Sequence, residues 1–380
     1  MPEMRILAFN TLRQVAELER EIRAAMDRVM ASGWFILGEE VRAFEREFAR
    51  FCEAREAVGV GNGTDAIELA LRAVGVGAGD EVITVAHTAP FTGLAVLAIG
   101  ATPVFVDVEE ETMLMNPAKI EAALSPATKA ILPVSLYGQA CDLDRIESLA
   151  EGSGVRVVVD AAQAHGASSG GSRGAALGGG PGGAVASGRE AGAVAAFSFY
   201  PTKNLGAYGD GGAVVTDDPE VAESVRRWRG GGMGEAYRSD EQGRNSRLDE
   251  LQSAILRVKL PYLERWNERR HAIAARYGEG LETVRTPADG SGRVYHLYVI
   301  RTPDRDGLRA HLAERGIGSA IHYPWPMHRQ GAFDGRCRVV GTLENTERCC
   351  AQVLSLPMYP EMTDGEVEEV IGAVNEFRGS

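Results

Sequence analysis

The chain has 380 residues, of which 44% are hydrophobic and 24% are charged, and its formal net charge at pH 7 is −13. This composition is typical of an ordinary globular protein that is long enough to form two domains. The acidic balance argues against a nucleic-acid-binding protein that relies on a basic surface. No apolar run reaches the length of a membrane span, and residues 1–10 lack a secretory signal pattern.

The N-terminal part predicts two amphipathic helices joined by an apolar loop. In the first helix, apolar residues recur every three to four positions: Leu12, Val15, Leu18, Ile22, Met26 and Val29. In the second helix they are Val41, Phe44, Phe48 and Phe51. The loop between them, Trp34–Leu37, is apolar and needs a cover, which we expect a second subunit to supply.

A glycine-rich turn follows the short strand at 58–60. It contains Gly63 and Thr64 and leads directly into an apolar helix. Backbone N–H groups and the positive end of the helix dipole favour a phosphate at such a place. The same residue types also form ordinary turns and helix caps, so this segment alone does not decide between the two interpretations.

From residue 82 onward, strands and helices alternate. Near-continuous apolar runs at 82–86, 103–106, 130–134 and 155–159 predict buried strands, and the segments 94–99, 118–124 and 143–150 predict helices. This alternation predicts an α/β fold whose mostly parallel sheet is flanked by helices. Ligands in such folds bind beyond the carboxyl ends of the strands. Asp160 directly follows one strand, so it is either a ligand-binding carboxylate or a helix cap.

The five cysteines are an odd number and include no CxxC pair of the kind that binds a metal. They are Cys52, Cys141, Cys337, Cys349 and Cys350. We expect reduced thiols, a cytoplasmic location and no metal site.

A glycine-rich segment at 168–192 comes before the next strand and contains almost no large apolar side chain. We expect a long flexible loop near the mouth of the site. Lys203 comes shortly after the buried run that contains Ser198. A desolvated lysine there favours the neutral amine, which can attack a carbonyl group and form a Schiff base. The alternative is an ordinary surface lysine.

The C-terminal part predicts a smaller α+β domain. Residues 244–251 enter a helix for which Asp249 or Ser246 is a suitable cap, and a second helix begins at Pro261. A strand at 294–300, a helix at 305–315 and a strand at 319–322 follow, and Thr363–Glu366 forms a capping box. We place a large domain at 1–254 and a small one at 255–380, with the N-terminal helix able to pack on the small domain.

Four features together match the needs of pyridoxal phosphate. The turn at Gly63 and Thr64 suits its phosphate, and Asp160 suits its ring nitrogen. Ser198 offers a hydroxyl donor, and Lys203 offers the amine that its aldehyde requires.

At these residues the chain resembles the DegT/DnrJ family of pyridoxal-phosphate-dependent sugar aminotransferases, within fold type I of the aspartate aminotransferases. The resemblance runs nearly end to end. Its most specific segments are Gly63–Ala66, Asp160–Gly166, Phe197–Gly206 and Asn245–Glu250. The family implies a cofactor that cycles through its amine form and a homodimer with composite active sites.

The resemblance also implies a role for each matching residue. Lys203 binds the cofactor and moves the proton, and Asp160 pairs with the ring nitrogen. Gln163 lies near the ring oxygen. The phosphate is held by Gly63, Thr64, Ser198 and, from the partner subunit, Asn245. Arg247, His322 and Tyr323 lie on the substrate side.

One departure from the family pattern concerns the cofactor ring. Family members often place an aromatic residue after the threonine that corresponds to Thr88, and it stacks on the ring. Here that residue is Ala89, with His87 and Phe91 nearby. The sequence does not decide which of these covers the ring.

The resemblance implies transfer of an amino group from L-glutamate to a keto group of a nucleotide-linked sugar. The segments 316–318 and 321–324 most resemble members that act on a dTDP-linked 3-keto-6-deoxy hexose. A 4-keto sugar, a keto-cyclitol and a non-catalytic regulator stay open as alternatives. The sugar dehydratases of the family are disfavoured, because their lysine position is a histidine and because no iron–sulfur cysteine pattern is present.

Overall fold

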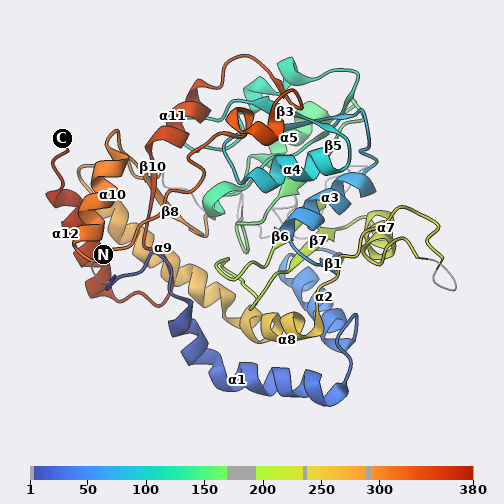
Figure 1. Ribbon diagram of the computed structural model, residues 1–380, viewed down its shortest axis with the longest axis horizontal. Coiled ribbons are helices and arrows are strands. Elements are labelled where there is room, and N and C mark those ends of the chain that lie inside the picture. Colours follow the sequence, from blue (N-terminus) through green and yellow to red (C-terminus); the bar gives the residue numbers. More distant parts are fainter. Residues whose placement is uncertain (1–3, 169–193, 234–237, 288–291, 380) are drawn as a thin grey trace.

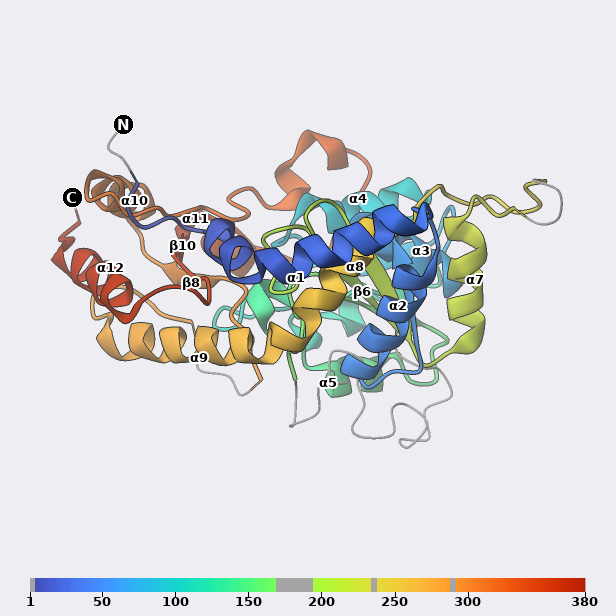
Figure 2. The same cartoon turned by 90° about the horizontal axis from the view of Figure 1, so that it is seen from below.

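The computed structural model describes residues 4–168, 194–233, 238–287 and 292–379. The flexible loop expected at 168–192 lies outside the described residues, apart from Ser168. In the described part, no helix is both long and apolar enough to cross a membrane. Both termini lie at the end of the molecule formed by α10 (Arg305–Glu314) and α12 (Asp364–Glu376), as Figures 1 and 2 show.

A mixed, mostly parallel sheet forms the centre of the larger part. In the described residues it has eight strands in the order β1-β7-β6-β5-β4-β2-β3-β9. Only β7 runs antiparallel to its neighbours, β1 and β6. The bounds are β1 Glu56–Val60, β2 Glu81–Val85, β3 Thr102–Val106, β4 Thr128–Ile131, β5 Arg156–Asp160, β6 Val194–Ser198, β7 Gly212–Thr216 and β9 Arg338–Val339. The expected α/β class is confirmed.

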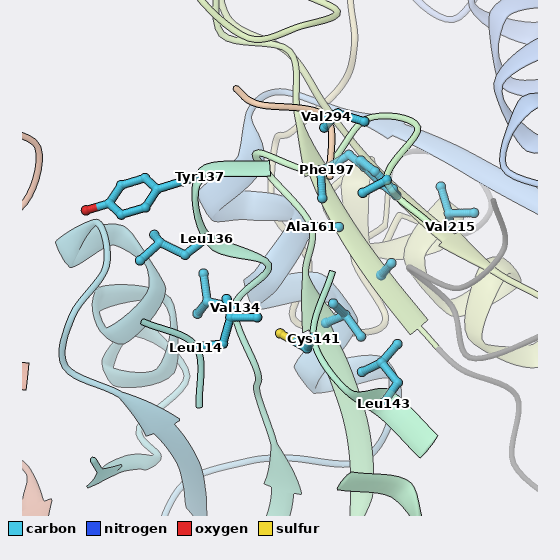
Figure 3. Packing of buried hydrophobic residues seen from close by; sticks show 14 of the residues in the cluster. Leu114, Val134, Leu136, Tyr137, Cys141, Leu143, Ala161, Phe197, Val215 and Val294 are labelled. Atoms are coloured by element: carbon cyan, nitrogen blue, oxygen red, sulfur yellow. The ribbon is translucent and has the colours of Figure 1, made fainter. Parts of the chain in front are cut away.

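Helices cover both faces of this sheet, because its strand residues point alternately to each side. Along β6, Ala195 and Phe197 join the core on one face, and Val194 and Ala196 join the core on the other. The first face packs against α2 (Glu39–Phe51), α5 (Leu143–Ala150) and α8 (Glu250–Lys259). The second packs against α3 (Gly63–Ala73), α4 (Pro90–Ala98) and α7 (Pro219–Arg229). Figure 3 shows the first core around Phe197 and Ala161.

The N-terminal helix α1 (Thr11–Ser32) forms as its periodicity predicts. It buries Leu18, Ile22 and Val29 and packs against α8. Its first turn also reaches the C-terminal part, because the Arg13 guanidinium donates to the Glu366 carboxylate at 2.8 Å. Helix α1 therefore connects the two parts of the molecule.

A second core forms in the C-terminal part, between the helices that Figure 2 shows at the left. Its elements are α9 (Leu263–Gly280), β8 (Tyr298–Arg301), α10 (Arg305–Glu314), β10 (Val353–Leu356) and α12 (Asp364–Glu376), with α11 (Glu344–Gln352) beside β8. The capping box of Thr363 and Glu366 is confirmed. The boundary at 254/255 stays a prediction, and β9 from the C-terminal part pairs with β3 of the large sheet.

Three predicted elements differ in the structure. In place of the strand expected at 319–322 there is an isolated bridge between Ala320 and Ser355. The helix expected at 118–124 is a pair of short 3-10 helices, Pro117–Lys119 and Glu121–Ala123. The strand expected at 294–300 begins only at Tyr298. Tyr295 has a φ of 42°, which interrupts an extended chain.

Phe48→Ala should lower the free energy of unfolding by about 3–5 kcal/mol, because it opens a cavity behind the β6 strand. Phe48 is fully buried, and its ring centroid lies 5.2 Å from those of both Phe197 and Phe199. Urea unfolding of the full-length protein measures the change. Phe91→Ala is the matched control, since Phe91 is 58% exposed. Equal losses for the two variants would contradict this account of the core.

Candidate active site

Lys203 lies in a tight turn beyond the carboxyl end of β6. The Lys203 N–H donates to the Tyr200 carbonyl at 2.9 Å, and the Ala207 N–H donates to the Phe199 carbonyl at 2.8 Å. A side-chain carbon added to Gly206 would lie 2.4 Å from the Pro201 carbonyl oxygen, so the turn requires glycine there. Burial lowers the pKa of the Lys203 amine to about 8, and the neighbouring Asp160 opposes this shift.

Asp160 ends β5, the parallel neighbour of β6, and is buried. Its Oδ2 accepts a hydrogen bond from the Thr92 hydroxyl at 2.7 Å, and its Oδ1 accepts from the Ala162 N–H at 3.1 Å. Burial raises the pKa of this carboxyl group, whereas these hydrogen bonds and the Lys203 amine lower it. A cation beside Asp160 would favour the ionised carboxylate further.

The start of α3 packs directly against Ser198. A side-chain carbon added to Gly63 would lie 2.6 Å from the Ser198 Cβ, so only glycine permits this approach. Asn62 caps the helix by accepting from the Asp65 N–H at 2.9 Å. In the described part of the chain, the N–H groups of Gly63 and Thr64 have no hydrogen-bond acceptor. They form an anion-binding helix start beside a hydroxyl group.

Gln163 joins the two parts of the molecule near Asp160. Its Oε1 accepts from the Tyr137 N–H at 2.8 Å, and its Nε2 donates to the Tyr323 hydroxyl at 2.7 Å. The rings of Tyr137 and Tyr323 stack with centroids 6.1 Å apart. Burial, together with the Asp160 charge, raises the pKa of Tyr323, so this phenol stays protonated.

His322 precedes Tyr323 and interacts electrostatically with the Lys203 amine. The His322 Nδ1 and the Ser355 hydroxyl are 2.8 Å apart. Burial lowers the pKa of His322 to about 4, with a further lowering by Lys203. The imidazole is therefore neutral near pH 7, and among the described residues no hydrogen-bond partner of its Nε2 is found.

Ala89 stands where family members often have an aromatic residue, and its neighbours lie in different environments. Ala89 caps α4, and Phe91 in the first turn of that helix is exposed. His87 is fully buried, its Nε2 lies 3.2 Å from the Tyr137 hydroxyl, and burial lowers its pKa to about 4. His87 thus supports Tyr137.

Asn245 and Arg247 stand apart from this group. Within the described ranges, no hydrogen bond or ion pair connects either side chain to Lys203 or Asp160. Asn245 is exposed and Arg247 is half-buried, whereas Ser246 and Leu248 are buried. The alternation places Asn245 and Arg247 on the outward side of the segment.

Sequence reasoning missed the residues that hold the Lys203 turn. Buried Lys259 of α8 donates to the Gly206 carbonyl at 2.7 Å, and its Nζ lies 4.4 Å from the centroid of the Tyr208 ring. The Asn204 side-chain amide donates to the Asn267 Oδ1 at 2.8 Å. The helical pattern around residue 259 gave no signal for Lys259, because a lysine there is usually solvated.

These groups fit pyridoxal phosphate. The half-buried Lys203 amine suits an aldehyde, and the buried Asp160 carboxylate suits a protonated ring nitrogen. The unengaged N–H groups of Gly63 and Thr64, with the Ser198 hydroxyl, suit a phosphate.

Comparison with known proteins agrees with this arrangement. The model of the DegT/DnrJ/EryC1/StrS aminotransferase family matches residues 16–375. A dTDP-3-amino-3,4,6-trideoxy-alpha-D-glucose transaminase of Streptomyces venezuelae is 46% identical over 366 residues, which are 95% of this chain and 93% of that protein.

Two solved structures are similar over most of their length. The crystal structure of S. venezuelae DesV in complex with a ketimine intermediate has a TM-score of 0.90 at 45% identity, covering 99% of this chain and 98% of that one. The structure of ntda from Bacillus subtilis with bound cofactor PMP has a TM-score of 0.84 at 30% identity, covering 94% of this chain and 81% of that one.

The lowered pKa of Lys203 predicts how the apoenzyme takes up its aldehyde. The rate of covalent incorporation of pyridoxal phosphate should rise with pH through about 8, because only the neutral amine attacks the aldehyde. Absorbance after mixing apoenzyme and cofactor across a pH series measures this rate. N-α-acetyl-lysine is the control, and its rate should keep rising toward the ordinary lysine pKa of 10.5. A protein profile that follows the control would contradict the assignment.

Proposed function

The chain belongs to the DegT/DnrJ/EryC1/StrS aminotransferase family, whose members use pyridoxal phosphate, and we propose that it moves an amino group from L-glutamate to a nucleotide-linked keto sugar. Family membership confirms the expected enzyme class and cofactor. The acceptor we propose is a dTDP-linked 3-keto-6-deoxy hexose. The observation that carries the proposal is the placement of Lys203, Asp160 and the α3 start at one edge of the sheet.

Pyridoxal phosphate, when bound, supplies an electron sink for changes at the carbon that bears the amino group. Lys203 holds and returns a proton at its Nζ, for which a pKa of about 8 is suited near neutral pH. Asp160 provides the negative charge that keeps a ring nitrogen protonated. Gln163 is oriented by Tyr137 and Tyr323 and presents a fixed amide to the ring oxygen.

The acceptor assignment rests on His322 and on the named relative. The S. venezuelae relative is named for a 3-amino product on a dTDP-linked sugar. With Nδ1 beside the Ser355 hydroxyl, a neutral His322 offers Nε2 to a sugar hydroxyl. Tyr323 offers its phenol from the same segment, and Arg247 offers a planar cation for a carboxylate or a diphosphate.

The surface next to Asn245 supports a homodimer with composite sites. Asp249 bridges to Ile36, so the outward side of the Asn245 segment is continuous with the apolar loop. In the single chain, Trp34, Phe35 and Ile36 are 63%, 49% and 41% exposed. A cavity of about 500 Å³, lined in part by Trp34 and Glu250, opens at the same face. A second copy would cover this face and receive Asn245 at its own phosphate site.

All five cysteines lie in the described residues as free thiols. Free thiols persist in a reducing compartment, so we place the enzyme in the cytoplasm.

The acceptor is tested by incubating the enzyme with L-glutamate and a panel of keto substrates. We expect repeated turnover to 2-oxoglutarate with the dTDP-linked 3-keto-6-deoxy hexose, and no more than one equivalent per cofactor with its 4-keto isomer or with a keto-cyclitol. Turnover with the 4-keto sugar alone would overturn the acceptor assignment, and an absence of cofactor amination by glutamate would overturn the donor assignment.

His322→Ala should slow the sugar half-reaction far more than the glutamate half-reaction, by about tenfold or more, because one hydrogen bond to the sugar is lost. Single-turnover spectra of the bound cofactor measure the two halves separately. His311→Ala is the matched control, since His311 lies on α10 and its Nε2 pairs with the Ala373 carbonyl. Equal losses in both halves would contradict a sugar-side role for His322.

Chains with Lys203→Ala and chains with Asn245→Asp should each be inactive as homodimers and should recover activity when mixed. Random exchange gives heterodimers with one intact site, so about a quarter of the wild-type activity is expected. Proven chain exchange without recovery would contradict a composite site.

A further inference from the structure

The Asp65 carboxylate makes contacts that its position in a helix cap does not require. It lies in the first turn of α3 and is 5% exposed. Asn62 already caps this helix, because its Oδ1 accepts from the Asp65 N–H. The Asp65 side chain instead spans to a segment about 180 residues later in the sequence, through Arg244 and Ser246.

Both oxygens of Asp65 are engaged. Its Oδ1 lies 2.8 Å from the Arg244 Nε. Its Oδ2 accepts from the Ser246 hydroxyl at 2.6 Å and from the Asn62 amide at 3.0 Å. The Ser246 oxygen in turn accepts from the Gly61 N–H at 2.9 Å. Ser246, which the sequence suggested as a helix cap, therefore binds the glycine-rich turn that leads into α3.

This arrangement fixes the residues on either side of Asn245. Arg244 is held by Asp65 and by Glu68, and Ser246 is held by Asp65 and Gly61. Asn245 lies between them and also bridges to Gly230 at the base of the arm that projects from α7 in Figures 1 and 2. Its backbone is pinned while its side chain stays exposed.

We infer that Asp65 is a positioning residue for two cofactor sites at once. In its own subunit it holds the turn that presents the N–H groups of Gly63 and Thr64. Through Arg244 and Ser246 it also sets the position from which Asn245 reaches the phosphate site of the partner subunit. Charge-assisted hydrogen bonds to a buried carboxylate make such a connection rigid. The inference rests on the proposed composite sites.

Heterodimers separate the two effects of Asp65→Asn. Differently tagged chains are co-expressed so that each dimer contains one site with Lys203. In the trans arm, wild-type chains pair with Asp65→Asn/Lys203→Ala chains, so the variant chain contributes only its Asn245. In the cis arm, Asp65→Asn chains pair with Lys203→Ala chains, so the variant lies in the subunit that has Lys203. Titration of apo-heterodimers with pyridoxal phosphate, followed by absorbance of the covalent form, gives the Kd of that site.

We expect the Kd to rise by about tenfold in both arms, relative to wild type paired with Lys203→Ala, because each arm loses one charge-assisted contact set. A trans arm that binds as tightly as this reference would overturn the inference. Amide hydrogen exchange of residues 244–247 in the apo-homodimer should also become faster in Asp65→Asn, and unchanged exchange would likewise contradict it.

Three further variants make the outcomes distinct. The first pairs wild-type chains with Asn245→Ala/Lys203→Ala chains and tests the composite site itself. Unchanged affinity in this pair would overturn the composite site. A loss of affinity in this pair, without a loss in the trans arm, would overturn only the role of Asp65. Asp142→Asn removes a helix-capping carboxylate on α5 and should leave the Kd unchanged. If Asp65→Asn dimers do not form, Ser246→Ala takes the place of Asp65→Asn, because it removes one of the Asp65 contacts. The affinity for pyridoxal phosphate in the trans arm should then fall several-fold.

Discussion

The burial of one amine and one carboxylate at the same edge of the sheet is the constraint on which the site depends. Lys203 and Asp160 follow two neighbouring parallel strands, so the fold brings them together without a long loop. Burial disfavours the charged form of each group, and their mutual attraction opposes it. The result is an amine with a pKa of about 8 next to a carboxylate that a cationic ligand would keep ionised.

The surrounding residues keep these two groups in place. The Lys203 turn is fixed from two helices: Asn267 of α9 accepts from the Asn204 side-chain amide, and Lys259 of α8 donates to the Gly206 carbonyl. Thr92 fixes the Asp160 carboxylate from α4. A mobile lysine would sample solvent and regain its ordinary pKa. The rigidity of this network therefore serves chemistry as much as stability.

The sequence predicted the sheet and the site members that follow strands, because the carboxyl ends of parallel strands meet at one edge. Asp160 ends β5, Ser198 ends β6, and Lys203 comes shortly after Ser198. The sequence did not predict Lys259 or the pair of His87 and Tyr137, since their partners are distant in sequence and their residue types are common on surfaces. The strand expected from 294 starts late because Tyr295 adopts a left-handed backbone, which no local pattern announces. Ser246 was ambiguous for the same reason, because its acceptor, Asp65, lies in α3, 181 residues earlier in the sequence.

The central claim is that Lys203, and no other lysine, reacts with the cofactor aldehyde. Borohydride reduction of the holoenzyme, followed by proteolysis and mass spectrometry, locates the residue that bears the pyridoxyl group. We predict that the label lies on the peptide that contains Lys203, in a ratio of one per chain. A label on Lys259 or on any other lysine, or a chain that takes up none, would contradict the account.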